Sequence, residues 1–208
     1  MTPGPDRRAA LEQYRRRAAV YDLELALFEP LRREAVARLA LQPGETVVDF
    51  GCGTGLSLPL LRAAVGATGH VVGIEQSPDM LAQARRRVAR HGWRNVQLIG
   101  APVESAHWSG RADAALFHFT HDLLQRPEAV AGALAHLKRG ARIVATGLRW
   151  APRWAAAVNV AVYVAARRSI TTLDGLDRPW HLLERHLGPM QVESRLLGAV
   201  YLAAGTLS

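Results

Sequence analysis

Short, nearly continuous apolar runs alternate along this chain with longer segments whose apolar residues recur at helical spacing. The apolar runs span residues 46–50, 70–75, 95–99, 112–118 and 141–146. Such runs are typical of parallel strands that are buried on both faces of a sheet. The segments between them predict helices over residues 55–65, 77–92 and 127–140. Regular alternation of strand and helix predicts a doubly wound, Rossmann-like α/β domain.

The N-terminal and C-terminal segments do not follow this alternation of strands and helices. Helical spacing predicts helices over residues 7–28 and 31–41, so that residues 1–44 form an N-terminal helical region. Near the other end, residues 192–196 and 199–204 read as two strands of a hairpin. Together with the five central strands, they predict a mostly parallel seven-stranded sheet with an antiparallel C-terminal hairpin strand.

Residues 147–189 interrupt the strands between the fifth run and the hairpin. They predict two helices, 152–168 and 179–187, and hold three of the five tryptophans, Trp150, Trp154 and Trp180. Ligands of open α/β sheets bind outside the carboxyl ends of the strands. We therefore expect this insertion to cover an acceptor, with Trp150 or Trp154 near it. Its apolar stretch, residues 155–166, is too short to span a bilayer and predicts a packed or interfacial helix.

Length and composition predict one globular domain of 208 residues in which nearly half the side chains are apolar. A net charge of +8 permits an anionic partner. The arginines are spread over Ala- and Leu-rich helices, however, and no basic run is interleaved with aromatics, which argues against nucleic acid. Five arginines within residues 7–17 suggest peripheral contact with an anionic membrane. A single cysteine, Cys52, and the absence of a secretory signal predict a reducing, cytoplasmic location.

The chemistry is concentrated after the first strand, where residues 47–55 read Val-Val-Asp-Phe-Gly-Cys-Gly-Thr-Gly. Twenty residues beyond Gly55, the second strand ends in Glu75. Glycines allow the backbone to approach a ligand, and an acidic residue at the second strand end can accept hydrogen bonds from ribose hydroxyls. This order of elements predicts a nucleotide-type cofactor site.

Asp49 and the glycine spacing indicate which cofactor binds. The glycines follow G-x-G-x-G, and Leu56 stands where a dinucleotide fingerprint has its third glycine. A carboxylate at Asp49 would repel a pyrophosphate, whereas it complements the sulfonium and ammonium of S-adenosylmethionine. The segment resembles motif I of the class I S-adenosylmethionine-dependent methyltransferases. The resemblance is closest to their small-molecule branch, which includes quinone-biosynthesis and phospholipid N-methyltransferases.

The resemblance implies a set of cofactor-binding residues. Asp49, Gly51, Gly53 and Gly55 would line the methionine and ribose side, and Glu75 would take the ribose hydroxyls. Gln76 and Met80 would flank the adenine, although helical spacing alone explains Met80 equally well as core packing. Tyr21 would help to close the pocket, or would simply pack on the sheet. The family aspartate after the third strand is replaced by Ala101, so the backbone of Val103 or the carboxylate of Glu104 would contact the adenine.

His118 and His121 are the candidate catalytic residues, because they lie at the end of the fourth strand and in the loop after it. A neutral imidazole there could remove a proton from a hydroxyl or ammonium acceptor, and Asp122 could orient it. Turnover would then rise with pH through the imidazole pKa. Each histidine alone is better explained as a partly exposed loop residue, and only together with Asp122 do the two form a candidate site. No second cluster of ligands supports a metal site.

These residues together predict methyl transfer from S-adenosylmethionine to a small, largely apolar molecule that is quinone-, polyketide- or lipid-like. Two alternatives stay open at this point. One is a dinucleotide-dependent oxidoreductase, which Asp49 and the missing third glycine oppose. The other is a non-catalytic module that keeps the cofactor fold, which the altered third motif leaves open.

Overall fold

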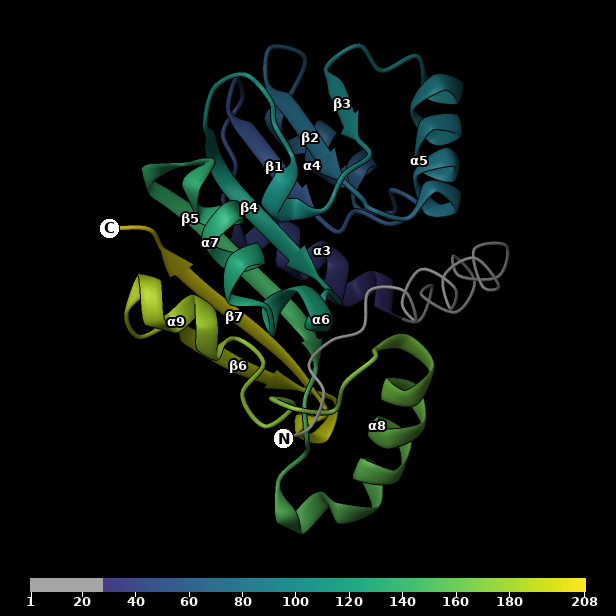
Figure 1. Ribbon diagram of the computed structural model, residues 1–208, viewed down its shortest axis with the longest axis vertical. Coiled ribbons are helices and arrows are strands. Elements are labelled where there is room, and N and C mark those ends of the chain that lie inside the picture. Colours follow the sequence, from purple (N-terminus) through teal and green to yellow (C-terminus); the bar gives the residue numbers. More distant parts are fainter. Residues whose placement is uncertain (1–27) are drawn as a thin grey trace.

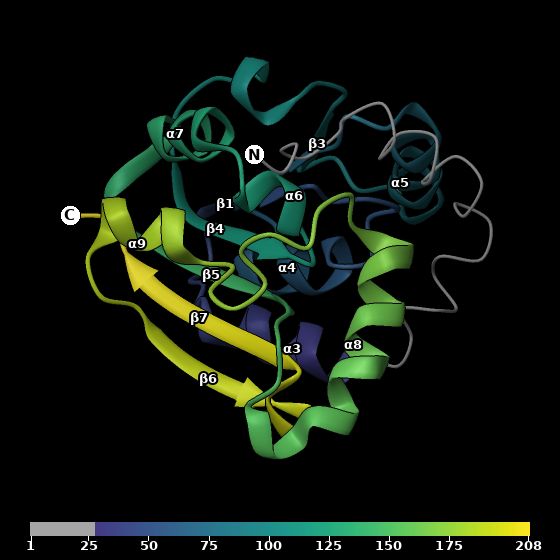
Figure 2. The same cartoon turned by 60° about the horizontal axis from the view of Figure 1, so that its bottom comes forward.

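The computed structural model of the protein describes residues 28–208, in which helices cover both faces of one central sheet (Figures 1 and 2). The strands are β1 (Thr46–Phe50), β2 (His70–Ile74), β3 (Val96–Ile99), β4 (Ala112–His118), β5 (Leu137–Leu148), β6 (Gln191–Arg195) and β7 (Val200–Thr206). The α-helices are α3 (Glu29–Arg38), α4 (Leu58–Val65), α5 (Pro78–His91), α6 (His121–Leu124), α7 (Pro127–Ala135), α8 (Ala156–Ser169) and α9 (His181–Leu187). Short 3-10 turns are η2 (Val103–Ser105), η3 (Arg153–Ala155) and η4 (Leu196–Gly198).

The strand order across the sheet is β3-β2-β1-β4-β5-β7-β6. Neighbours from β3 to β5 are parallel, whereas β7 runs antiparallel to both β5 and β6. The predicted fold class is thereby confirmed, including the reversed last strand. The carboxyl ends of β1, β2 and β4 consequently meet at one edge of the sheet, which is where ligands of such folds bind.

Strand side chains alternate between two apolar layers. Val48 and Phe50 lie in the layer shared with α7 and α9, whereas Val47 lies in the layer shared with α3 and α4. All three side chains are fully buried. Burial on both faces explains why these strands appear in the sequence as continuous apolar runs instead of alternating ones.

Local signals placed α5 correctly. Ser77 caps its first turn by accepting a hydrogen bond from the Met80 N–H at 3.5 Å, and Pro78 occupies the first helical position. Gly92 ends the helix in the left-handed region at φ 62°. A side chain that caps the first turn and a glycine beyond the last turn are the expected terminators.

The prediction for residues 127–140 was wrong in its second half. The helix ends at Ala135, and β5 already begins at Leu137. Leu137 pairs with Ala112 across a register shift in the ladder, and Gly140 has φ 78°. Sheet pairing with β4 thus overrides the helical pattern of this segment, which only the tertiary structure reveals. The one-turn helix α6 had not been predicted either.

The insertion after β5 projects beyond the end of the sheet. In Figures 1 and 2, α8 stands at one end of the molecule, and the chain after it runs back past α6 toward α9. No helix of the described residues is long and apolar enough to cross a membrane. The predicted helix over residues 7–28 and Tyr21 lie outside the described residues, apart from the last position of that helix.

Candidate cofactor and acceptor site

The glycine loop forms the turn from β1 into α4. Gly51, Gly53 and Gly55 all have positive φ angles of 73°, 56° and 80°, a region in which other residues are strained. A Cβ added at Gly51 would come within 2.6 Å of Thr120 Cγ2. The loop between β4 and α6 therefore lies directly against the glycine loop, and both belong to the carboxyl edge of the sheet.

Glu75 fixes the glycine loop to the end of β2. Its Oε2 accepts a hydrogen bond from the Gly53 N–H at 3.0 Å, and its Oε1 accepts one from the Ser77 N–H at 2.7 Å. Burial raises the pKa of Glu75 above its usual value, although the backbone hydrogen bonds oppose that shift. A carboxylate oxygen has two acceptor positions, so Glu75 can hold the loop and still accept from ribose hydroxyls.

Asp49 is the next-to-last residue of β1, and only 1% of its surface is exposed. Its Oδ2 has no hydrogen-bond partner. Burial raises its pKa to about 7; the nearby Arg32 opposes the rise and Glu75 adds to it. A bound cation would relieve this energetic cost, because it would favour the ionised carboxylate. The position therefore suits the positively charged part of S-adenosylmethionine.

Arg32 of α3 is a site residue that the sequence analysis missed. Its side chain is 2% exposed, and its charge acts on both Asp49 and His118. Its Nη1 donates to Glu29, whereas Nε and Nη2 are buried without a partner. The signal was present in the sequence, because Arg32 shares the buried face of α3 with Leu31, Ala35 and Val36. A cation on the apolar stripe of a helix calls for a partner.

His118, at the end of β4, is a neutral imidazole at physiological pH. Its Nδ1 lies 2.7 Å from Thr146 Oγ1, and its Nε2 is buried without a partner. Burial, helped by the charge of Arg32, lowers its pKa to about 3. The next residue, Phe119, has φ 58° and donates its N–H to the Thr146 carbonyl at 2.8 Å. A left-handed phenylalanine beside an orphaned imidazole is the kind of local strain found at functional sites.

His121 and Asp122 hold the insertion instead of forming an imidazole–carboxylate pair. His121 Nε2 lies 2.9 Å from the Asp174 carbonyl oxygen, and burial lowers the pKa of His121 to about 4. Asp122 accepts hydrogen bonds from the Thr171 N–H at 3.0 Å and from its hydroxyl at 2.8 Å. The expectation that Asp122 orients a histidine is therefore wrong, and its role is to anchor the chain after α8.

The residues expected around the adenine differ in their burial and in their hydrogen bonds. Glu104 Oε1 accepts from Arg126 Nη2 at 2.7 Å, whereas its Oε2 is buried without a partner. Val103 and Met80 are buried, and Gln76 is half-buried. Met80 is one of the fully buried apolar side chains of the protein, as core packing also predicts. Their contact with an adenine stays a prediction.

Five of the buried polar atoms without a partner belong to residues that act on or lie near the carboxyl ends of β1 and β4. They are Nε and Nη2 of Arg32, Oδ2 of Asp49, Nε2 of His118 and Oγ1 of Thr120. Native proteins rarely leave so many buried polar atoms unsatisfied in one place, unless a ligand satisfies them. The set combines a cation with acceptors, so it fits a ligand that carries a carboxylate, an ammonium and hydroxyls, as S-adenosylmethionine does.

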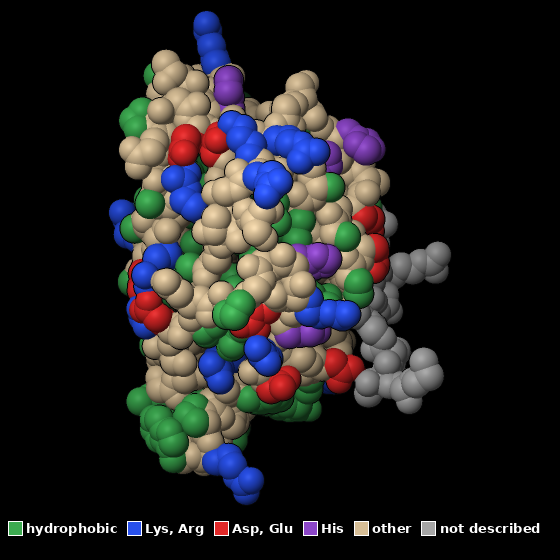
Figure 3. Space-filling view, turned by 90° about the vertical axis from the view of Figure 1, so that its left-hand side faces the viewer, with side chains coloured by type: hydrophobic (Ala, Val, Ile, Leu, Met, Phe, Trp, Pro, Cys, Tyr) green, Lys and Arg blue, Asp and Glu red, His purple; other side chains and the backbone are tan. Residues whose placement is uncertain are grey.

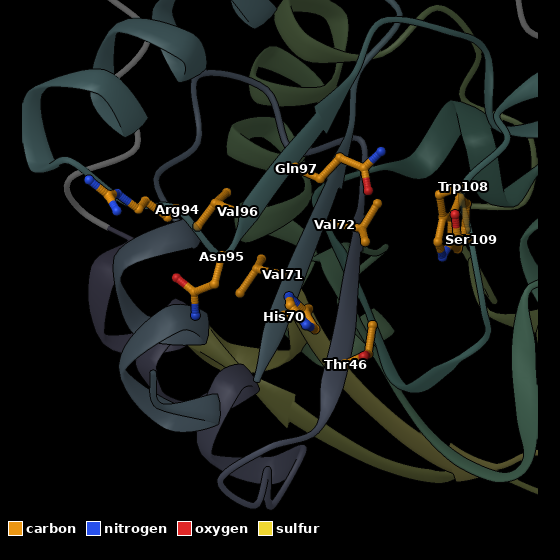
Figure 4. A pocket seen from close by; sticks show the side chains of 10 residues that line it. All are labelled: Thr46, His70, Val71, Val72, Arg94, Asn95, Val96, Gln97, Trp108 and Ser109. Carbon is orange, nitrogen blue, oxygen red and sulfur yellow. The ribbon is translucent and has the colours of Figure 1, made fainter. Parts of the chain in front are cut away.

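A surface hollow of about 310 Å³ lies at the opposite edge (Figure 4). Thr46 and His70, the first residues of β1 and β2, line it together with Trp108 and Ser109. It is therefore at the amino ends of the strands and is separate from the site described above. Among residues 28–208, no three His, Cys, Asp or Glu side chains lie together in a way that could hold a metal ion.

Comparison with known proteins agrees with this geometry. Residues 47–140 match the model of a family described as a methyltransferase domain. The chain is 34% identical over 134 residues to the aklanonic acid methyltransferase DauC of Streptomyces, covering 62% of this chain and 60% of that protein. It is 40% identical over 88 residues to a 23S ribosomal RNA uracil C5-methyltransferase, RlmD, of Shewanella, covering 40% of this chain and 19% of that protein.

Among solved structures, the fold resembles that of the N-methyltransferase NodS from Bradyrhizobium japonicum in complex with S-adenosylhomocysteine. The TM-score is 0.70 at 15% identity, over 95% of this chain and 98% of that chain. The match over residues 47–140 and the resemblance in fold support a class I S-adenosylmethionine-dependent methyltransferase domain. The cofactor that these similarities support is S-adenosylmethionine. The chain spans 60% or less of the length of these curated relatives.

Proposed function

We propose that the protein transfers a methyl group from S-adenosylmethionine to a small, largely apolar molecule of quinone-, polyketide- or lipid-like character. The observation that carries this proposal is the cluster of unpartnered polar atoms from Arg32, Asp49, His118 and Thr120. It lies where the cofactor of this class binds, at the carboxyl edge of the parallel strands. The sulfonium of the cofactor supplies an activated methyl group.

The chain's own residues then position the reactants. Asp49 and Glu75 hold the charged and hydroxylated parts of the cofactor, and Arg32 offers two N–H groups to a carboxylate. Alignment of acceptor and methyl group contributes most of the acceleration in such an in-line displacement. A base is needed only where the acceptor is protonated.

His118 is one of two candidate bases, and it lies at the end of β4, next to the glycine-loop contact of Thr120. When Nδ1–H donates to Thr146 Oγ1, the lone pair of the unpartnered Nε2 is available to accept a proton. Because its pKa is lowered to about 3, this imidazole is in its basic form at any physiological pH. His121 Nε2 contacts the Asp174 carbonyl and so holds the insertion, while its buried Nδ1 has no partner and is a second candidate to accept a proton.

Two observations support an apolar acceptor. The insertion after β5 is fixed to α6, next to the site, through Thr171 and Asp174, and it is rich in apolar residues. DauC is named for a methyl transfer to aklanonic acid, a small organic molecule. The second candidate acceptor is RNA, which the RlmD similarity and the net charge of +8 favour.

The test has two stages. Calorimetric titration should show binding of S-adenosylhomocysteine and none of NAD or NADP. Transfer of a radiolabelled methyl group from S-adenosylmethionine should then be measured on naphthoquinols, on aromatic polyketide acids and on unmodified ribosomal RNA. We expect label on an aromatic small molecule. Label on RNA alone would show that the acceptor is RNA and not a small molecule. Cofactor binding without transfer to any of these acceptors would favour a non-catalytic module.

A further inference from the structure

The helix α8 has an apolar face that is exposed among the described residues, 28–208. Val160, Tyr163 and Val164 are 67%, 48% and 45% exposed, and Trp154 just before the helix is 75% exposed. Only Val162 and Ala166 of the helix are buried. Helical spacing puts these two residues on one side and Val160 and Val164 on the other. The helix is therefore apolar on its outer as well as on its inner face.

The turn η4 extends this face. Leu196 and Leu197 are each 63% exposed and both have left-handed backbone, with φ 50° and 57°. A Cβ on Gly198 would come within 2.5 Å of Pro152 Cδ, so η4 packs against the residues that lead into η3. Figures 1 and 2 show η4 beside the start of α8, and Figure 3 shows hydrophobic side chains gathered at this end of the molecule. Two strained leucines held in solvent suggest a surface with a function.

The charged residues of η3 and α8 are all positive, whereas Glu34 and Glu193 beside η4 are paired with Arg195. Arg153, Arg167 and Arg168 are exposed at the two ends of α8, and residues 129–173 contain no aspartate or glutamate. A twofold contact between copies would bring these arginines together without acidic partners on the helix. An anionic surface, in contrast, would face the exposed Arg153 and Arg167.

We propose that α8, η3 and η4 form a docking surface for an anionic lipid bilayer, with Trp154, Val160, Val164, Leu196 and Leu197 entering the interfacial zone. A helix of 14 residues is about 21 Å long, which is too short to span the roughly 30 Å hydrocarbon core, so it lies in the plane of the membrane. Trp and Tyr favour that zone because they join an apolar ring to a polar atom.

The docking surface is physically joined to the methyl-transfer site. Asn159 of α8 binds both backbone groups of Ala151, with Ala151 N–H donating to Oδ1 at 2.7 Å and Nδ2 donating to the Ala151 carbonyl at 3.1 Å. After α8, Thr171 binds Asp122 of α6. A membrane-seated α8 would thus place the acceptor side of the site close to the bilayer, from which an apolar molecule can be taken.

Flotation with vesicles of neutral phosphatidylcholine, with and without about one third anionic phosphatidylglycerol, tests the proposal. We expect the protein to float with anionic vesicles at low salt and to be released by high salt. Val160→Glu and Val164→Glu should each lower the partition coefficient roughly tenfold. Arg153→Gln and Arg167→Gln should each lower it roughly fivefold, on anionic vesicles only.

The matched control is Ala89→Glu, which adds the same charge at an exposed position of α5, far from α8 in Figure 1, and should float like the unchanged protein. No flotation at low salt would overturn the proposal. So would Val160→Glu and Val164→Glu proteins that float normally, because another segment would then bind lipid. A dimer by light scattering that Val160→Glu dissociates would assign the face to a second copy. The assay needs no turnover, so its result is independent of the proposed methyl transfer.

Discussion

Asp49 links cofactor affinity to pH. Its pKa of about 7 means that the free protein holds a proton there below neutrality, whereas a ligand ammonium favours the ionised form. Binding therefore releases that proton, and the Kd for S-adenosylhomocysteine should rise by up to about tenfold per pH unit below 7 and level off above it. Titration calorimetry from pH 5.5 to 8.5 measures this slope.

The Asp49→Asn protein is the control for that experiment. It should bind more weakly and lose most of the slope, since no carboxylate remains to be neutralised at this position. An unchanged slope in Asp49→Asn would assign the titration to another group, of which Glu75 is the nearest with a raised pKa.

Gly53 has a backbone that other residues adopt only with strain, at φ 56°. Gly53→Val should abolish binding of S-adenosylhomocysteine, because a branched side chain would occupy cofactor space and disturb the bond from its N–H to Glu75. Gly92→Val is the matched control: its φ is 62° with open space around it, so it carries similar strain. We expect Gly92→Val to melt at a lower temperature but to bind normally. Equal binding by both variants would contradict the assignment of the glycine loop.

His118 should be needed for turnover only where the acceptor is a hydroxyl. His118→Ala is then expected to lower kcat about a hundredfold while cofactor affinity holds. The low pKa values of about 3 for His118 and about 4 for His121 place any imidazole-dependent rise below pH 5. Titration of these two imidazoles should therefore cause no change in kcat on a hydroxyl acceptor between pH 6 and 8. A rise centred near pH 6.5 that His118→Ala removes would contradict the buried, neutral imidazole.

At the scale of elements, α6 acts as the anchor of the insertion. Asp122 accepts the Thr171 N–H and hydroxyl, and Gln125 Nε2 donates to the Pro179 carbonyl at 3.2 Å. Asp122→Ala should loosen this segment, raising the KM for the acceptor with little change in cofactor Kd. Limited trypsin digestion should then cut faster after Arg167 and Arg168. Asp177→Ala, an exposed residue of the same segment, is the control and should digest like the unchanged protein.

Binding of S-adenosylhomocysteine, the product of the cofactor, should raise the thermal stability of the whole protein. A ligand that binds only the folded state at 100 times its Kd stabilises by about 2.7 kcal/mol. For a chain of this size, that corresponds to an increase in Tm of roughly 5–10 °C. Thermal unfolding with S-adenosylhomocysteine should show such a shift, and NAD should show none. An equal shift with both ligands would point to non-specific binding.

Elements with strong local signals were predictable from sequence. The buried strands were visible as apolar runs, and α5 was visible from Ser77, Pro78 and Gly92, because caps and turn glycines act within a few residues. The glycine loop with Asp49 and Glu75 was predictable for the same reason. The end of α7 was not, because Leu137 becomes a strand through pairing with β4, which a local pattern does not record.

The sequence by itself therefore determined the fold class, the cofactor class and the placement of Asp49 and Glu75 near the ends of their strands, since these depend on short-range chemistry and regular spacing. Only the tertiary structure decided which polar atoms meet. It brought Arg32 of α3 against Asp49 and His118, turned Asp122 toward Thr171, and left the apolar face of α8 in solvent. These contacts join residues that lie tens of positions apart in the sequence. Whether a polar atom is buried or hydrogen-bonded depends on such contacts and not on the residue type alone.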